Sequence, residues 1–205
     1  MDYYIDFDNT LYNTPLLTDK MLSKLVESAC SQKKLDAIEL KNQCISLFNR
    51  EHIYNIYELV SYFSDKYELD RSNIIKAIDN EILNGKNFIY DDSISFLENL
   101  KKNNNNIFLL SYSNNNLNYQ TEKILGSGLA PYFDGLFITS NPKYELDINY
   151  SNGIFIDDNP KDLLGLYSKN SKKIIRLKRL NKKKKKIELN IKIEEYNKLI
   201  DIPIN

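Results

Sequence analysis

Cysteine is scarce in this sequence, with two in 205 residues, and long apolar runs are absent. Cys30 and Cys44 lie 14 positions apart and form no CxxC pair, which argues against a disulfide framework and against a zinc site. No stretch reaches the ~18 uninterrupted apolar residues of a membrane span. The opening residues, MDYYIDFDNT, contain no basic region that would indicate a signal peptide. We therefore expect a soluble, cytoplasmic protein.

Net charge is lacking as well, since 28 basic residues match 28 acidic ones. The distribution is uneven, because residues 172–186 contain ten Lys or Arg and no Asp or Glu, which leaves 18 basic against 28 acidic residues elsewhere. An acidic body argues against a general nucleic-acid binder. The basic segment is interpreted as a solvated edge or loop, and contact with nucleic acid or an anionic membrane surface is the alternative.

Apolar runs alternate with helical patterns over much of the chain, and the hydrophobic content of 42% is enough for a core. This alternation predicts a parallel sheet covered on both faces, a doubly wound α/β fold. The expected strands are 3–7, 107–110, 136–138, 154–156 and 174–177. The expected helices of this part are 91 or 92 to 102, 117–125 and 160–167, the first of them capped by Asp91 or Asp92.

The alternation is interrupted by a helical block at residues 15–85. About four helices and no strand are expected there, and one face carries apolar residues at steps of three and four. Thr14, followed by Pro15, is typical of a helix start, Asp70 of a cap, and Gly85 of a helix end. The block is interpreted as a cap inserted into a core of residues 1–14 and 86–205, with hinges near 12–14 and 85–88.

Polar side chains follow the ends of the predicted strands, where ligands bind in an open parallel sheet. The first strand ends in Asp6-Phe7-Asp8-Asn9-Thr10 and the second at Ser111, and Lys143 follows the third. The fourth ends in DDNPKD, which contains Asp157, Asp158 and Asp162. Converging carboxylates repel each other unless a cation lies between them, and Mg²⁺ prefers such oxygen ligands. This set suits phosphoryl transfer, with Ser111 donating to a phosphoryl oxygen and Lys143 adding positive charge.

These residues resemble the four motifs of the haloacid dehalogenase (HAD) superfamily. DFDNT is similar to its DxDxT signature, and Ser111, Lys143 and the pair Asp158 and Asp162 resemble its second, third and fourth motifs. All four occur in the family's order over residues 6–162. The resemblance implies a magnesium-dependent hydrolase with a Rossmann-like core and an inserted helical cap.

The resemblance also implies a role for each residue. Asp6 would attack phosphorus and become an aspartyl-phosphate, and Asp8 would act as general acid and then as general base. Thr10 would steady the loop and the Asp6 carboxylate, and would belong to the phosphate-binding set together with Ser111 and Lys143. Magnesium would be held by Asp6, the backbone carbonyl of Asp8, and Asp158. Asp157 and Asp162 would lie around the ion without binding it directly, and would contact it through water molecules or contact the residues that bind it.

Simpler interpretations exist for several of these residues. Lys143 alone would be a solvated surface lysine, and Ser111 a turn residue. The three aspartates of the fourth motif could cap the following helix. Only 13 residues separate Lys143 from Asp157, which predicts that Lys143 lies on a loop and not at a helix start. His52, the single histidine, is interpreted as an ordinary exposed residue, with substrate contact as the alternative.

The function that this set favours is hydrolysis of a small phosphomonoester, with a small phosphorylated metabolite as partner. A dehalogenase would share Asp6 but would need neither a second catalytic carboxylate nor a metal, so Asp8 argues against it. A phosphomutase would share every core motif, and a phosphonatase would add a cap lysine. From another class, a non-catalytic module that binds anions or nucleic acid could use the basic segment, but the carboxylate set argues against it.

Overall fold

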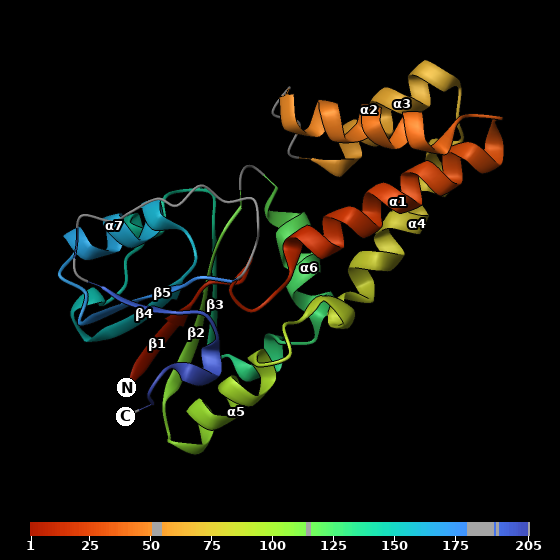
Figure 1. Ribbon diagram of the computed structural model, residues 1–205. Coiled ribbons are helices and arrows are strands. Elements are labelled where there is room, and N and C mark those ends of the chain that lie inside the picture. The colour runs from red at the N-terminus through yellow and green to blue at the C-terminus, as the bar shows by residue number, and fades with distance from the viewer. Residues whose placement is uncertain (51–54, 114–115, 180–190, 192, 205) are drawn as a thin grey trace. The chain divides into compact units, whose positions relative to one another are not determined.

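The computed structural model describes residues 1–50, 55–113, 116–179, 191 and 193–204. The chain forms two compact units, one of residues 1–13 and 86–205 and one of residues 14–85 (Figure 1). In the described part of the first unit, six strands form one fully parallel sheet in the order β3-β2-β1-β4-β5-β6. Its strands are β1 (Asp2–Ile5), β2 (Asn106–Tyr112), β3 (Gly135–Thr139), β4 (Gly153–Asp157), β5 (Lys173–Leu177) and β6 (Glu194–Tyr196).

Helices cover both faces of this sheet, as the alternation of strands and helices predicts. The chain moves from β1 to β2 to β3 in one direction and from β4 to β5 in the other, so right-handed crossovers place α5 and α6 opposite α7. Figure 1 shows α7 on one side of the sheet and α5 on the other. The helices are α5 (Ser93–Lys102), α6 (Leu117–Ser127) and α7 (Pro160–Ser168), with 3-10 turns η1 (Gly85–Phe88), η2 (Ala130–Tyr132), η3 (Lys143–Glu145), η4 (Tyr150–Asn152) and η5 (Leu199–Asp201).

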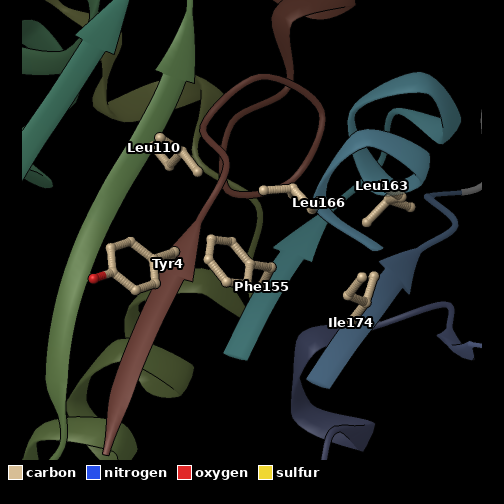
Figure 2. Packing of buried hydrophobic residues seen from close by; sticks show 6 residues of the cluster. All are labelled: Tyr4, Leu110, Phe155, Leu163, Leu166 and Ile174. Carbon is tan, nitrogen blue, oxygen red and sulfur yellow. The ribbon is translucent and has the colours of Figure 1, made fainter. Parts of the chain in front are cut away.

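The sheet face under α7 is packed with aromatic rings. Tyr4 of β1 and Phe155 of β4 are partners in register and stack with ring centroids 4.8 Å apart. They share a buried cluster with side chains of β2, α7 and β5 (Figure 2). Residues in register on neighbouring strands point to the same face, so this cluster ties the first strand to its neighbours. The other members in Figure 2 are Leu110, Leu163, Leu166 and Ile174.

The strand order confirms the doubly wound fold, and β3 and β4 lie three strand spacings apart with β2 and β1 between them. The sequence pattern missed β6. Its residues, Glu194, Glu195 and Tyr196, carry charge and no apolar alternation, so nothing in them indicated a strand. The two glutamates form ion pairs with basic residues in β5 and just after it. Charged side chains of this kind are typical of the exposed edge of a sheet.

The second unit contains four helices in its described residues, which confirms the helix count: α1 (Thr14–Gln32), α2 (Ala37–Arg50), α3 (Ile56–Tyr67) and α4 (Arg71–Leu83). Asp70 caps α4 as predicted, since its carboxylate accepts from the N–H groups of Ser72 and Asn73. Such a cap contributes about 1 kcal/mol. Gly85 marks the helix end as predicted, because α4 ends at Leu83 with Asn84 as its C-cap and Gly85 follows directly, as the first residue of η1. Among the described helices of either unit, none combines the length and apolar character needed to cross a bilayer.

Candidate active site

Asp6 and Asp8 lie on a tight loop that follows β1. The Asp6 N–H donates to a β4 carbonyl at 2.9 Å, which continues the strand pairing as far as Asp6. The loop then closes on itself, because two later N–H groups donate to the carbonyl of Phe7 at 3.0 Å. Asn9 adopts φ 60°, a left-handed conformation that asparagine tolerates better than most residues. The loop is thus held by backbone hydrogen bonds at the carboxyl end of the sheet.

Lys143 reaches into the same place and contacts three carboxylates. Its Nζ donates to Asp6 Oδ1 at 2.6 Å and to Asp157 Oδ2 at 2.7 Å, and it lies 3.8 Å from Asp162 Oδ2. The side chain is 2% exposed, so the interpretation as a surface lysine was wrong. The prediction that Lys143 would not begin a helix was also wrong, since it is the first residue of η3. The short link contains two such 3-10 turns, η3 and η4.

The turn that carries Lys143 is anchored from two sides. The next residue, Tyr144, packs so closely on α7 that a Cβ atom at Gly165 would lie 1.9 Å from its ring. Only glycine leaves room for this approach. Tyr150 donates from its hydroxyl to the carbonyls of Lys143 at 3.0 Å and Leu146 at 2.7 Å. These contacts hold the backbone of Lys143 in place and thereby direct its side chain.

Asn159 organises the fourth motif. Its N–H donates to Asp157 Oδ1 at 2.7 Å, and its amide Nδ2 donates to Asp162 Oδ2 at 2.8 Å. Its own Oδ1 accepts from the N–H of Lys161 at 3.1 Å and so caps α7. The residue that caps α7 is therefore Asn159. The simpler interpretation, in which one of the aspartates caps this helix, was wrong. The sequence contained the signal, since asparagine followed by proline at the first helical position is typical of a cap.

The electrostatics of the cluster favour added positive charge. Burial raises the pKa of Asp6 well above its usual range, and the ammonium group of Lys143 offsets this only in part. Three neighbouring carboxylates, Asp157, Asp158 and Asp8, raise the Asp6 pKa further. Burial alone would lower the pKa of Lys143, but the carboxylates around it outweigh burial and the pKa is raised. Lys143 therefore stays an ammonium group at neutral pH, while ionised Asp6 needs a further cation.

The Asp8 side chain is held by helix α6, which the sequence analysis did not link to the site. Lys123 Nζ lies 2.5 Å from Asp8 Oδ1, and Gln120 Nε2 donates to Asp8 Oδ2 at 2.7 Å. The same Gln120 nitrogen donates to Ser111 Oγ at 2.7 Å. A signal was present in the sequence, because Gln120 and Lys123 share one helix face with Ile124 and Ser127. All four are buried, so this face of α6 presents polar groups to the sheet.

Thr10 holds the loop in a different way from the one expected. The residue is fully buried, and within the described chain its hydroxyl has no hydrogen-bond partner, so it does not contact the Asp6 carboxylate. Its carbonyl instead accepts from Arg179 Nη2 at 2.7 Å. The Arg179 guanidinium also donates to Asp92 at 2.8 Å and stacks 4.2 Å from the Tyr90 ring. Asp92 is the N-cap residue of α5, as one of the two predicted alternatives, but its side chain makes no cap hydrogen bond and instead accepts from Arg179.

The strand-end residues around Asp6 line a cavity of about 440 Å³. Its wall includes both carboxylates of the first motif and Lys143, but Ser111 and Thr10 do not belong to it. Ser111 is fully buried and accepts a hydrogen bond from Gln120 Nε2. The structure thus brings Asp6, Asp8 and Lys143 together with the aspartates of the fourth motif. The remaining residues of the wall are Asn9, Tyr112, Asp157, Asp158, Asn159, Pro160, Asp162 and Arg176.

The donor set of this cavity fits a divalent cation. Asp6, Asp157 and Asp158 each offer a carboxylate oxygen, and these atoms lie within 4.8 Å of one another. Oxygen donors are the ligands that Mg²⁺ prefers. Both oxygens of Asp157 accept hydrogen bonds, one from Lys143 and one from a backbone N–H. Asp157 and Asp158 both lie within reach of a cation bound beside Asp6.

The basic segment lies partly in β5. Arg176 is 9% exposed and Lys173 is partly buried, and both pair with carboxylates of β6, as does Lys178. Residues 173–177 of the segment therefore form a strand whose charges are paired, and the interpretation as a solvated edge was wrong for Arg176, whereas Lys172 and Lys178 are exposed. Residues 180–186 of the segment, and His52, lie outside the described residues.

Comparisons with known proteins find the fold in solved structures. No protein-family model matches the chain, and no curated protein does. The putative HAD-hydrolase YfnB from Bacillus subtilis, determined with magnesium bound, is 15% identical with a TM-score of 0.63 over 98% of this chain and 95% of that one. A HAD phosphatase from Thermococcus onnurineus is 17% identical, with a TM-score of 0.62 over 98% of this chain and 94% of that one. The L-2-haloacid dehalogenase RSc1362 is 14% identical, with a TM-score of 0.60 over 98% of this chain and 95% of that one.

These neighbours include a phosphatase and a dehalogenase, so their likeness to this chain concerns architecture and not one reaction. Each match covers 98% of this chain, so it includes both the parallel sheet and the helical unit inserted after the first strand. Our chain therefore has the fold of the haloacid dehalogenase superfamily.

Proposed function

We propose that this protein is a magnesium-dependent phosphatase that hydrolyses a small phosphomonoester through an aspartyl-phosphate on Asp6. One observation carries the proposal: a second carboxylate, Asp8, lines the same cavity as Asp6 and the acidic fourth motif. Dehalogenation needs one nucleophilic carboxylate and no acid for its halide leaving group. Cleavage of an ester needs an acid for the departing alkoxide, and Asp8 supplies one.

In the first step an oxygen of Asp6 attacks phosphorus and forms a new P–O bond. The bond from phosphorus to the leaving oxygen breaks, and that oxygen takes a proton from Asp8. Lys143, held by Asp6 and Asp157, keeps its charge throughout and orients the nucleophile. Ser111, at the end of β2, does not line the cavity in this structure, and its role would be to donate its hydroxyl proton to a phosphoryl oxygen after a local shift when substrate binds.

In the second step water attacks the phosphorus of the aspartyl-phosphate. Asp8, now a carboxylate, accepts the proton of the water, and the bond between phosphorus and Asp6 breaks. Inorganic phosphate leaves, and both carboxylates return to their starting states. The two roles of Asp8 are those that the resemblance to the haloacid dehalogenase motifs implies for the carboxylate two residues after the nucleophile.

Asp6, Asp158 and the backbone carbonyl of Asp8 would hold the magnesium ion, and Asp157 and Asp162 would surround it. When bound, magnesium would supply the charge that screens the phosphoryl oxygens from Asp6 and stabilises the transferring group. The raised pKa of Asp6 supports this assignment, because a nucleophilic carboxylate must be ionised at neutral pH.

We also propose that the unit of residues 14–85 is a lid that selects a small phosphorylated metabolite. Its two connections pair with each other beside the nucleophile loop. The N–H of Asn13 donates to the Phe88 carbonyl at 2.7 Å, and the N–H of Tyr90 donates to the Leu11 carbonyl at 3.1 Å. A unit that enters and leaves at this point is suited to closing over substrate and excluding water.

A phosphate-release assay on a panel of phosphorylated metabolites tests the proposed function. Activity is expected with Mg²⁺, should disappear with a chelator, and should return when Mg²⁺ is restored. Ca²⁺ should restore little of it, because its larger and looser coordination shell misplaces the nucleophile. Full phosphate release in excess chelator would contradict the metal assignment. Halide release from 2-haloacids without phosphate release would replace the proposal with a dehalogenase.

A further inference from the structure

Lys123 is a buried cation that the reaction described above does not use. Its side chain is 3% exposed, and its Nζ lies 2.5 Å from Asp8 Oδ1. The ammonium group also lies 5.6 Å from the ring centre of Phe7 and 5.4 Å from that of Tyr119. Burying a lysine is costly unless its charge is paired, and here the partner is the proposed acid and base.

We propose that Lys123, together with Gln120, is a positioning residue for Asp8, and that Gln120 also orients the hydroxyl of Ser111. This inference rests on the proposed function and names residues of α6 as part of its machinery. The two side chains take one carboxylate oxygen each, Lys123 at Oδ1 and Gln120 at Oδ2. With both oxygens held from one rigid helix, the carboxylate has a single orientation relative to Asp6.

The Gln120 amide has only one orientation that satisfies its neighbours. In its ionised form, which the second step of the proposed reaction needs, the Asp8 carboxylate accepts hydrogen bonds and donates none, so the nitrogen of the amide faces it. The same nitrogen lies 2.7 Å from Ser111 Oγ, so Ser111 accepts this hydrogen bond. A hydroxyl that accepts from Gln120 keeps its own proton for another partner, and a phosphoryl oxygen is the partner that the proposed function supplies.

Lys123→Met tests the proposal, because methionine keeps an unbranched apolar stem between the two rings and removes the ammonium group. Turnover of an alkyl phosphate should fall by about 100-fold, the scale of a misplaced catalytic group. Turnover of p-nitrophenyl phosphate should fall much less, because its leaving group needs little protonation. Lys123→Arg should recover part of the loss. Lys101→Met, which removes an exposed lysine that pairs with Asp134 and does not line the cavity, is the control expected to leave both rates unchanged.

A double-mutant cycle separates positioning from a structural role. If Lys123 acts through Asp8, Lys123→Met should add little to the loss already caused by Asp8→Asn. Equal losses on both substrates, which persist in the Asp8→Asn background, would overturn the proposal. If Lys123→Met does not fold, Gln120→Leu removes the other donor and is measured in the same way, with the same two outcomes.

A structural measurement keeps this inference separate from the proposed function. In crystals of the wild type and of the variant that folds, the Asp8 carboxylate should lie in different positions. An unchanged Asp8 carboxylate would overturn the positioning role whatever the activity. If the wild type releases phosphate from no ester, the proposed function fails, and the position of Asp8 in the two crystals still decides the role of Lys123.

Discussion

Replacing Lys143 by methionine should destabilise the protein strongly, because it leaves a buried acidic cluster without its cation. Lys143 is 2% exposed, and its two bonded partners, Asp6 and Asp157, have side chains that are 7% and 3% exposed. Breaking one buried ion pair costs about 3–5 kcal/mol, most of it the penalty of the charge left behind. For a chain of this length, that loss corresponds to a fall in Tm of roughly 6–20 °C.

The measurement is thermal unfolding of the wild type and of Lys143→Met, without added metal, over a range of pH. Protonation of the cluster removes the repulsion, so the loss of stability should be smaller at low pH than at neutral pH. The raised pKa of Asp6 places this relief above the usual range of a carboxyl group. Added Mg²⁺ should stabilise Lys143→Met more than it stabilises the wild type, since the variant lacks a competing cation.

Lys101→Met is the matched control. Lys101 bonds Asp134 at the same 2.6 Å, but their side chains are 37% and 41% exposed. An exposed pair contributes about 0–1 kcal/mol, so the control should unfold within a few degrees of the wild type, roughly 4 °C at most. If Lys143→Met lost no more stability than Lys101→Met, the buried cluster would not depend on its lysine, and the electrostatic account of the site would be refuted.

Three further predictions follow from the same contacts. Asp8→Asn should lower turnover of alkyl phosphates by about 10²–10⁴-fold and that of p-nitrophenyl phosphate less; equal losses, with the first step limiting, would contradict its role as an acid. Gly165→Ala should destabilise the fold by about 1–3 kcal/mol and lower turnover, because the new Cβ displaces Tyr144. Unfolding experiments measure the loss of stability, and kinetic assays measure the loss of turnover. The pKa of Asp92 is lowered, since the Arg179 guanidinium outweighs burial, so its stabilising contribution is complete above pH ~4 and is lost as pH falls below that value. Asp92→Asn should therefore flatten the acid limb of the wild-type stability curve, and an unchanged limb would contradict this.

The sequence predicted the architecture well because its signals were local. Apolar runs followed by carboxylates mark β1 and β4, and the alternation of strands and helices leaves few topologies for a parallel sheet. The errors fall where tertiary contacts overrule local preference. Asp92 is a good capping residue, but Arg179, distant in sequence, binds its carboxylate. The strand β6 exists because its charged side chains meet those of β5, which no pattern within β6 could show.

The candidate site was predictable in its residues at strand ends and not in the residues that support them. Asp6, Lys143 and Asp157 meet in the structure because parallel strands end at one edge. Lys123 and Gln120 come from a helix that the sequence analysis predicted but did not link to the site. Their burial depends on how α6 lies on the sheet, and a lysine among apolar neighbours is a signal that only the fold explains.

The central claim is that Asp6 carries the phosphoryl group during turnover, and mass spectrometry of acid-quenched protein tests it most directly. After rapid mixing with a phosphomonoester and Mg²⁺, the peptide that contains Asp6 should carry a phosphoryl group, and the same peptide from Asp6→Asn should carry none. The variant should fold normally and release no phosphate, because the amide keeps the shape of the carboxylate and lacks its nucleophilic oxygen. Phosphate release by Asp6→Asn, or a phosphoryl group trapped on another residue, would contradict the account.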